Sequence, residues 1–66
     1  MKNERESMTL SMVNMIDEVT KMRIDLGKPD ETITTIFTPV IYDDAKRLEI
    51  IEHKSLKIAE YAQALK

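Results

Sequence analysis

The segment from Met8 to Leu26 carries apolar side chains on two sides of one predicted helix. One side holds Met8, Met12, Met15, Val19, Met22 and Leu26, which are separated by alternating steps of four and three residues. The nearly opposite side holds Leu10, Val13 and Ile24. A helix that is apolar on two sides needs a neighbour on each side. We therefore expect all of these residues to serve the core or self-association, and we favour this reading of the methionines over an adaptable groove for another protein.

The chain is too short to cover both apolar sides of this helix with its own residues. With 66 residues it is expected to form a single small helical domain, residues 1–66, near the lower size limit for an unaided core. It has no cysteine and one histidine, so disulfides and most zinc sites are excluded and we expect no metal or other cofactor. Self-association is the remaining stabiliser of such a small chain.

The composition is that of a folded domain with a polar surface. The chain is 42% hydrophobic and 33% charged. Its longest apolar run is Val40 to Tyr42, which predicts neither a membrane span nor a signal peptide, and we expect a cytoplasmic protein. The net charge of −2 gives no general support to binding of nucleic acid or of an acidic membrane.

The first helix is expected to begin between Asn3 and Ser7. Asn3 with Glu6 resembles a capping box, and Ser7 is the alternative N-cap. The helix should end at Gly27, because glycine favours a left-handed C-cap and Pro29 cannot extend the helix.

The segment after Gly27 is ambiguous. We favour a short helix from about Pro29 or Asp30 to Phe37, since acidic residues suit a first helical turn. Its many threonines and isoleucines favour a strand instead. No other segment of the chain has comparable character, so a strand here would be expected to pair with the same strand of a second copy.

A second long helix is expected to reach the end of the chain. Thr38 and Pro39 suit its start, and Asp43 is the alternative start. Its apolar arc is expected to contain Ile41, Ala45, Leu48, Ile51, Ser55, Ile58, Ala59, Ala62 and Leu65. Glu52 projects near the middle of this arc, so it needs either exposure or a cation from a neighbour, for which Arg23 is a candidate.

These elements predict an all-α fold. We expect an antiparallel helical hairpin with a short connecting helix or turn, which self-associates into a helical bundle. The face opposite the apolar arc is basic, and we expect it to bind a partner protein through Lys46, Arg47, His53, Lys54, Lys57 and Tyr61.

The expected function is non-enzymatic. No nucleophile elbow, phosphate-binding glycine loop or second histidine is present, and a lone His53 beside Glu49 and Glu52 is a weak candidate for a general base. We expect a small oligomeric regulatory or inhibitory protein that binds another protein. The alternatives are a dimeric DNA-binding transcriptional regulator that uses the basic face, and a structural subunit of a larger phage or secretion assembly.

Overall fold

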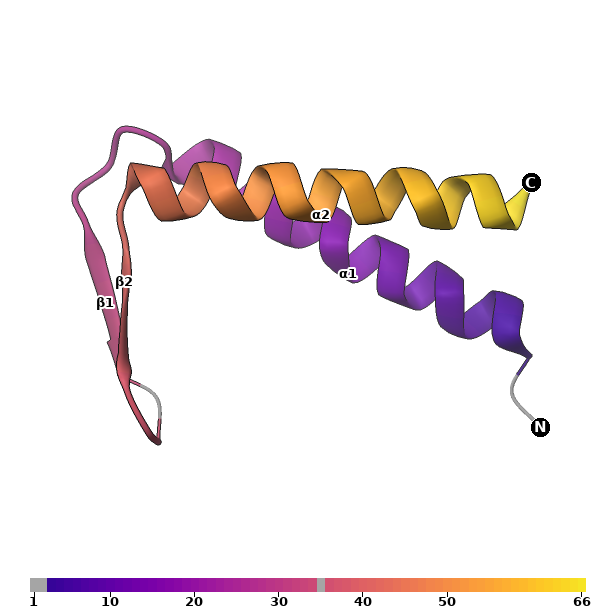
Figure 1. The fold of residues 1–66 in the computed structure, drawn as a ribbon, viewed down its shortest axis with the longest axis horizontal. Coiled ribbons are helices and arrows are strands. Elements are labelled where there is room, and N and C mark those ends of the chain that lie inside the picture. The colour runs from indigo at the N-terminus through magenta and orange to yellow at the C-terminus, as the bar shows by residue number, and fades with distance from the viewer. Residues whose placement is uncertain (1–2, 35) are drawn as a thin grey trace.

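The computed structural model describes residues 3–34 and 36–66. Helix α1 (Glu4–Asp25) and helix α2 (Asp44–Leu65) pack side by side in antiparallel directions, and a β-hairpin joins them. The hairpin consists of β1 (Glu31–Thr34) and β2 (Pro39–Tyr42). It projects from the end of the helix pair opposite to the two chain termini, as Figure 1 shows.

Both ends of α1 follow the sequence signals. The Asn3 side chain accepts hydrogen bonds from the backbone N–H groups of Arg5 at 2.8 Å and Glu6 at 3.3 Å, which confirms Asn3 rather than Ser7 as the N-cap. Gly27 has a φ of +84°, the left-handed conformation that stops the helix. The predicted boundaries of the first helix are therefore confirmed.

The prediction for the segment after Gly27 is wrong. A strand from Glu31 to Thr34 replaces the short helix, although Thr35, which that helix would have contained, lies outside the described residues. The strand pairs within its own chain, with Ile33 opposite Val40 and Thr34 opposite Pro39. An all-α fold is therefore incomplete, because this small antiparallel sheet stands between the two helices.

The second helix begins at the alternative position. Asp43 is the N-cap and its carboxylate accepts the N–H of Lys46 at 2.8 Å, whereas Pro39 belongs to β2. Proline suits the first residue of a short edge strand as well as it suits the first turn of a helix. Its β-branched neighbours Val40 and Ile41, which face Ile33 and Thr32 on β1, favour the strand.

Few of the described side chains are fully buried. Met15 is 7% exposed, and Met8, Met12, Val19 and Met22 are half-buried against α2, so the methionine stripe forms the inner face of α1. The inner face of α2 differs from the predicted arc. Ile51, Ile58 and Leu65 lie inside as predicted, together with Arg47, Ile50, Lys54 and Tyr61, whereas Ala45, Leu48, Ser55, Ala59 and Ala62 are exposed.

This rotation of α2 has a physical reason. Lysine, arginine and tyrosine bury their long apolar parts while a polar tip reaches a partner, so hydrophobicity alone does not locate the inner face. Lys54 reaches Glu18 of α1 at 3.9 Å. Arg47 is 1% exposed and completes the inner face where the two helices join the hairpin.

Arg47 connects α2 to the turn that follows α1. Its guanidinium donates to the carbonyl oxygens of Lys28 and Pro29, both at 3.0 Å, and to the Asp44 carboxylate at 3.1 Å. The same Asp44 oxygen accepts the N–H of Gly27 at 3.0 Å. We call this set of contacts the Arg47 clamp. It fixes the base of the hairpin to both helices.

The molecule is elongated. Its radius of gyration is 14.2 Å, whereas a compact chain of 66 residues is expected to have about 11 Å. Helices that touch along one seam only, with a hairpin standing off their end, explain the difference (Figure 1).

Removing the Arg47 clamp is expected to destabilise the fold. Arg47→Met keeps much of the side-chain volume but leaves two carbonyl groups without donors, which should lower the free energy of unfolding by about 1–3 kcal/mol. Denaturation followed by far-ultraviolet circular dichroism at a fixed protein concentration measures this change. Lys57→Met, at an exposed position of α2, is the control and should change stability little.

Candidate functional site

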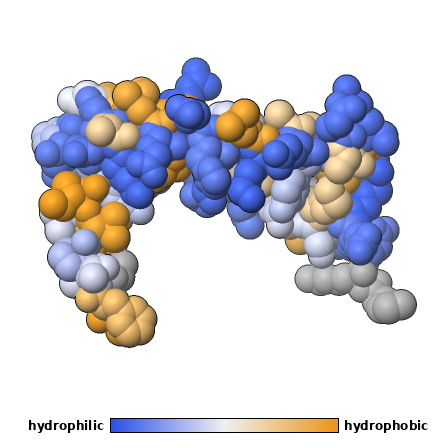
Figure 2. Space-filling model, in the orientation of Figure 1, coloured by the Kyte–Doolittle hydropathy of each residue, from blue (hydrophilic) through white to orange (hydrophobic). Residues whose placement is uncertain are grey.

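The free end of the hairpin carries the most exposed large apolar side chains of the described residues. Ile36 is 93% exposed and Phe37 is 91% exposed. Figure 2 shows this apolar tip projecting away from the polar surface of the helices. Large exposed aromatic and aliphatic side chains on a projecting element are typical of contact surfaces.

The hairpin is apolar and acidic, without any basic residue. The sequence from Pro29 to Ala45 contains no lysine or arginine, and acidic Asp30 and Glu31 lie at the base of β1. Phosphate-binding surfaces need clustered cations, so this element is unsuited to nucleic acid. Its exposed side chains are mainly apolar and uncharged toward the tip.

The two faces of the hairpin have different surroundings. Glu31, Ile33 and Tyr42 line a hollow of about 220 Å³ where the hairpin meets the helices, together with Glu18, Lys21, Met22, Asp25 and Arg47. Ile41 lies on the other face and is exposed. The hairpin is thus held at its base, and its tip stands free of the helices (Figure 1).

Acidic side chains at this junction are held by cations. Asp25 is 8% exposed and accepts hydrogen bonds from Lys21 at 2.9 Å and Lys28 at 3.2 Å. These lysines hold the pKa of Asp25 below its usual value, and the Asp25 hydrogen bond raises the pKa of Lys21. The Gly27 N–H and then the Arg47 guanidinium lower the pKa of Asp44. Both carboxylates therefore favour the folded state in their charged form.

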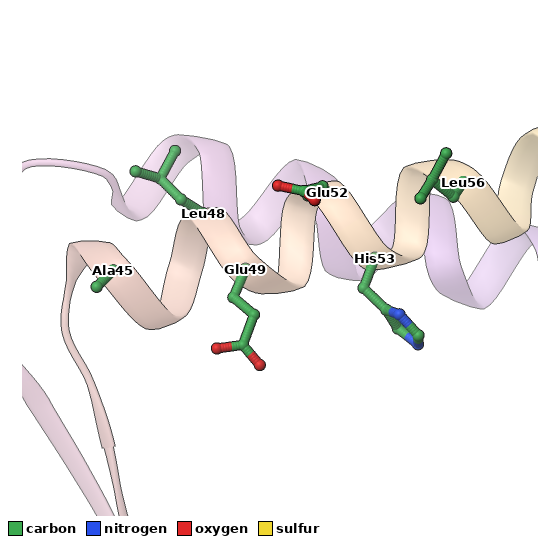
Figure 3. A pocket seen from close by; sticks show the side chains of 6 residues that line it. All are labelled: Ala45, Leu48, Glu49, Glu52, His53 and Leu56. Atoms are coloured by element: carbon green, nitrogen blue, oxygen red, sulfur yellow. The ribbon is translucent and has the colours of Figure 1, made fainter.

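A second surface lies on the helices. Leu48, Glu52 and Leu56 follow one another at single-turn spacing on α2, and they line a shallow hollow of about 570 Å³ with Ala45, Glu49 and His53. Figure 3 shows Leu48, Glu52 and Leu56 on one side of α2, and Glu49 and His53 pointing toward the side from which the hairpin leaves. Both leucines are more than half exposed, at 54% and 62%.

Helix α1 contributes apolar residues to the same side of the molecule. Glu18 lines the hollow beneath the hairpin, and Ile16 lies two residues earlier, about 200° around the helix. Ile16 therefore points away from the hairpin side, as do Val13 and Thr20, its neighbours at helical spacing. We call Val13, Ile16, Thr20 and Arg23 of α1, with Leu48, Glu52 and Leu56 of α2, the outer face.

The structure distributes the predicted partner-binding residues over two environments. His53 and Lys57 are exposed, and Lys46 is half-buried with its ammonium 3.8 Å from Glu49. Arg47 lies in its clamp, Lys54 pairs with Glu18, and Tyr61 is half-buried against α1. The basic face is therefore divided, and Arg47 does not reach the surface.

The predicted self-association residues are also divided. The methionines and Val19 face α2, whereas Leu10, Val13, Ile24 and Leu26 are exposed. Ile36 and Phe37, which are exposed, were not among the residues predicted to bind a partner. The sequence signal that could have identified them is an apolar pair flanked by threonines, directly before Thr38-Pro39. This pattern fits the loop of a hairpin if both flanking segments are strands.

Neither a metal-binding cluster nor a membrane-spanning helix is present among residues 3–34 and 36–66. No group of three histidine, aspartate or glutamate side chains there is arranged to hold a metal ion. In the same residues, neither helix has a segment that is sufficiently long and apolar to cross a bilayer.

Acid is expected to loosen the junction. Because the folded pKa values of Asp25 and Asp44 are lowered, their stabilisation is complete above the unfolded value near 3.8 and is lost as the pH falls through the folded values. Thermal unfolding between about pH 5 and about pH 2 should show the midpoint falling with acid. Asp44→Asn should lower the midpoint at the upper pH and reduce its fall, whereas exposed Asp17→Asn should behave like the wild type.

Comparison of the chain with protein-family models, with curated proteins and with solved structures finds no match.

Proposed function

We propose that this chain is a non-enzymatic, self-associating protein that regulates or inhibits another protein by binding it through the hairpin. The observation that carries the proposal is the exposure of Ile36 and Phe37, at 93% and 91%, on an element that stands clear of the helices. An aromatic side chain that enters a pocket of a partner contributes strongly to binding, because it buries a large area with little loss of rotamer freedom.

The construction of the hairpin supports this role. The Arg47 clamp holds its base, so the tip is presented in one direction, and a preorganised contact element loses less entropy on binding. The acidic residues at the base and the lack of cations along the hairpin favour a protein partner with an apolar pocket and a neutral or basic rim.

The DNA-binding alternative receives less support. Its contacts were expected from Lys46, Arg47, Lys54 and Lys57, but the Arg47 side chain is buried and Lys54 pairs with Glu18. A helix face with so few free cations offers little counterion release on binding DNA.

Polar replacement of the tip tests the proposal. Ile36→Ser combined with Phe37→Ser should abolish capture of the partner from the native host, since losing a central apolar anchor costs about 2 kcal/mol or more, roughly thirtyfold in affinity. Tagged wild type and variant are compared by quantitative mass spectrometry of the captured proteins. Thr32→Ala, in the shaft of the hairpin, is the matched control and should capture the same partner as the wild type.

Two results would contradict the proposal. One is a partner captured equally by the wild type and the tip variant, with circular dichroism showing the same helical content in both. The other is salt-sensitive, roughly micromolar binding of random duplex DNA that is lost in Lys54→Glu with Lys57→Glu, which would favour the transcriptional regulator.

A further inference from the structure

The chain exposes more surface than a compact monomer of its mass. Its accessible surface is 5316 Å², whereas a compact chain of 7.7 kDa is expected to expose about 4,300 Å². The excess of about 1,000 Å² resembles the roughly 800 Å² that each partner buries in a stable protein interface. The projecting hairpin contributes part of this excess, and the uncovered faces of the helices contribute the rest.

The outer face resembles a protein interface in its composition. It joins apolar side chains from both helices, including Ile16 of α1 with Leu48 and Leu56 of α2, all of them exposed. The hairpin leaves from the other side of the helix pair, so none of its described residues covers the outer face (Figure 1, Figure 3). Each helix thus has an inner face against the other helix and an outer face without a neighbour.

The outer face also carries one charge of each sign. Glu52 lies between Leu48 and Leu56, one turn from each. Arg23 follows Ile16 by two turns and lines a hollow with Thr20 and Ile24. Within residues 3–34 and 36–66, neither Glu52 nor Arg23 takes part in an ion pair. A carboxylate among apolar side chains needs a cation when the face is covered.

These charges suit a second copy of the same chain better than a nucleic acid or an acidic bilayer. In a two-fold symmetric interface, a residue that contacts a second residue across the axis is contacted in return. One pairing of Arg23 with Glu52 therefore generates two ion pairs, and both charges of both copies are neutralised. A nucleic acid or an acidic bilayer would leave Glu52 facing like charges.

We propose that a second copy docks on the outer face, so that the two helix pairs form a four-helix bundle with reciprocal Arg23–Glu52 contacts. This inference specifies the self-association included in the proposed function, but it does not depend on what the hairpin binds. Because each hairpin lies on the side away from the outer face, the dimer presents two apolar tips on opposite outer surfaces. A dimer of this form binds two partner molecules, or two sites of one assembly, at the same time.

Charge reversal tests the inference. Sedimentation equilibrium of the wild type at micromolar concentration should give twice the chain mass of 7.7 kDa. Arg23→Glu alone places two pairs of like charges across the interface, as does Glu52→Arg alone, and each should weaken dimerisation at least about tenfold. An equimolar mixture of the two single variants should restore the dimer as a heterodimer, because each copy then supplies the charge that the other lacks. The double variant should restore the homodimer.

Two controls distinguish a lost Arg23–Glu52 contact from misfolding or a nonspecific effect of charge. Lys57→Glu reverses a charge on α2 away from the outer face and should leave the dimerisation constant unchanged. Circular dichroism of each single variant should show the helical content of the wild type. Wild-type monomers at micromolar concentration, or single variants that dimerise as tightly as the wild type, would overturn the inference. Restoration in the mixture cannot arise from misfolding, so it supports the contact directly.

The outcomes remain distinct from those of the proposed function. A monomer that still captures its partner through Ile36 and Phe37 overturns the dimer and leaves the hairpin proposal standing. A dimer with the expected charge responses that captures no partner supports the inference and contradicts the hairpin proposal.

Discussion

The buried guanidinium of Arg47 is the constraint on which the arrangement of this molecule depends. A cation withdrawn from water is tolerated only when its donors are satisfied, and Arg47 meets this condition with two carbonyl groups and one carboxylate. Those acceptors belong to the turn after α1 and to the first turn of α2. The contact therefore sets the rotation of α2 about its axis, and with it the residues that α2 turns inward. Leu48, the next residue, is consequently directed away from the inner face.

A chain of two helices and a hairpin has few elements with which to cover the apolar side chains that remain exposed. Both helices carry apolar residues on two sides, and a single antiparallel contact covers one side of each. A larger protein would place a third helix or a sheet against the remaining side. In this chain the residues between the two helices form a hairpin that projects from the end of the helix pair. In the proposed dimer, the second copy would cover the remaining side.

The limits of prediction from the sequence differ between elements. The first helix could be delimited because Asn3 and Gly27 act locally, through one cap and one backbone conformation. The hairpin was missed because Pro39 suits the start of a helix or of a strand, and the pairing of Ile33 with Val40 depends on residues apart in the sequence. The Arg47 clamp has no sequence signature, since its acceptors are mostly backbone carbonyls. Of the candidate site, the sequence predicted a second apolar side of α1 at Leu10, Val13 and Ile24, and these residues are exposed. Only Val13 of them belongs to the outer face, and the tip at Ile36 and Phe37 depended on knowing the hairpin.

The small sheet has a consequence for the behaviour of the protein in concentrated solution. With two strands, each strand has one outer edge whose amide and carbonyl groups face solvent. Such edges can add a further strand, either from a client polypeptide or from a neighbouring hairpin, and threonine and isoleucine favour that extension. Pro39 removes one amide hydrogen from the β2 strand, and Glu31 places a charge at the end of β1. Proline and charged residues in edge strands generally oppose fibril-like stacking, so replacing Pro39 and Glu31 with apolar residues is expected to lower solubility before it changes the fold.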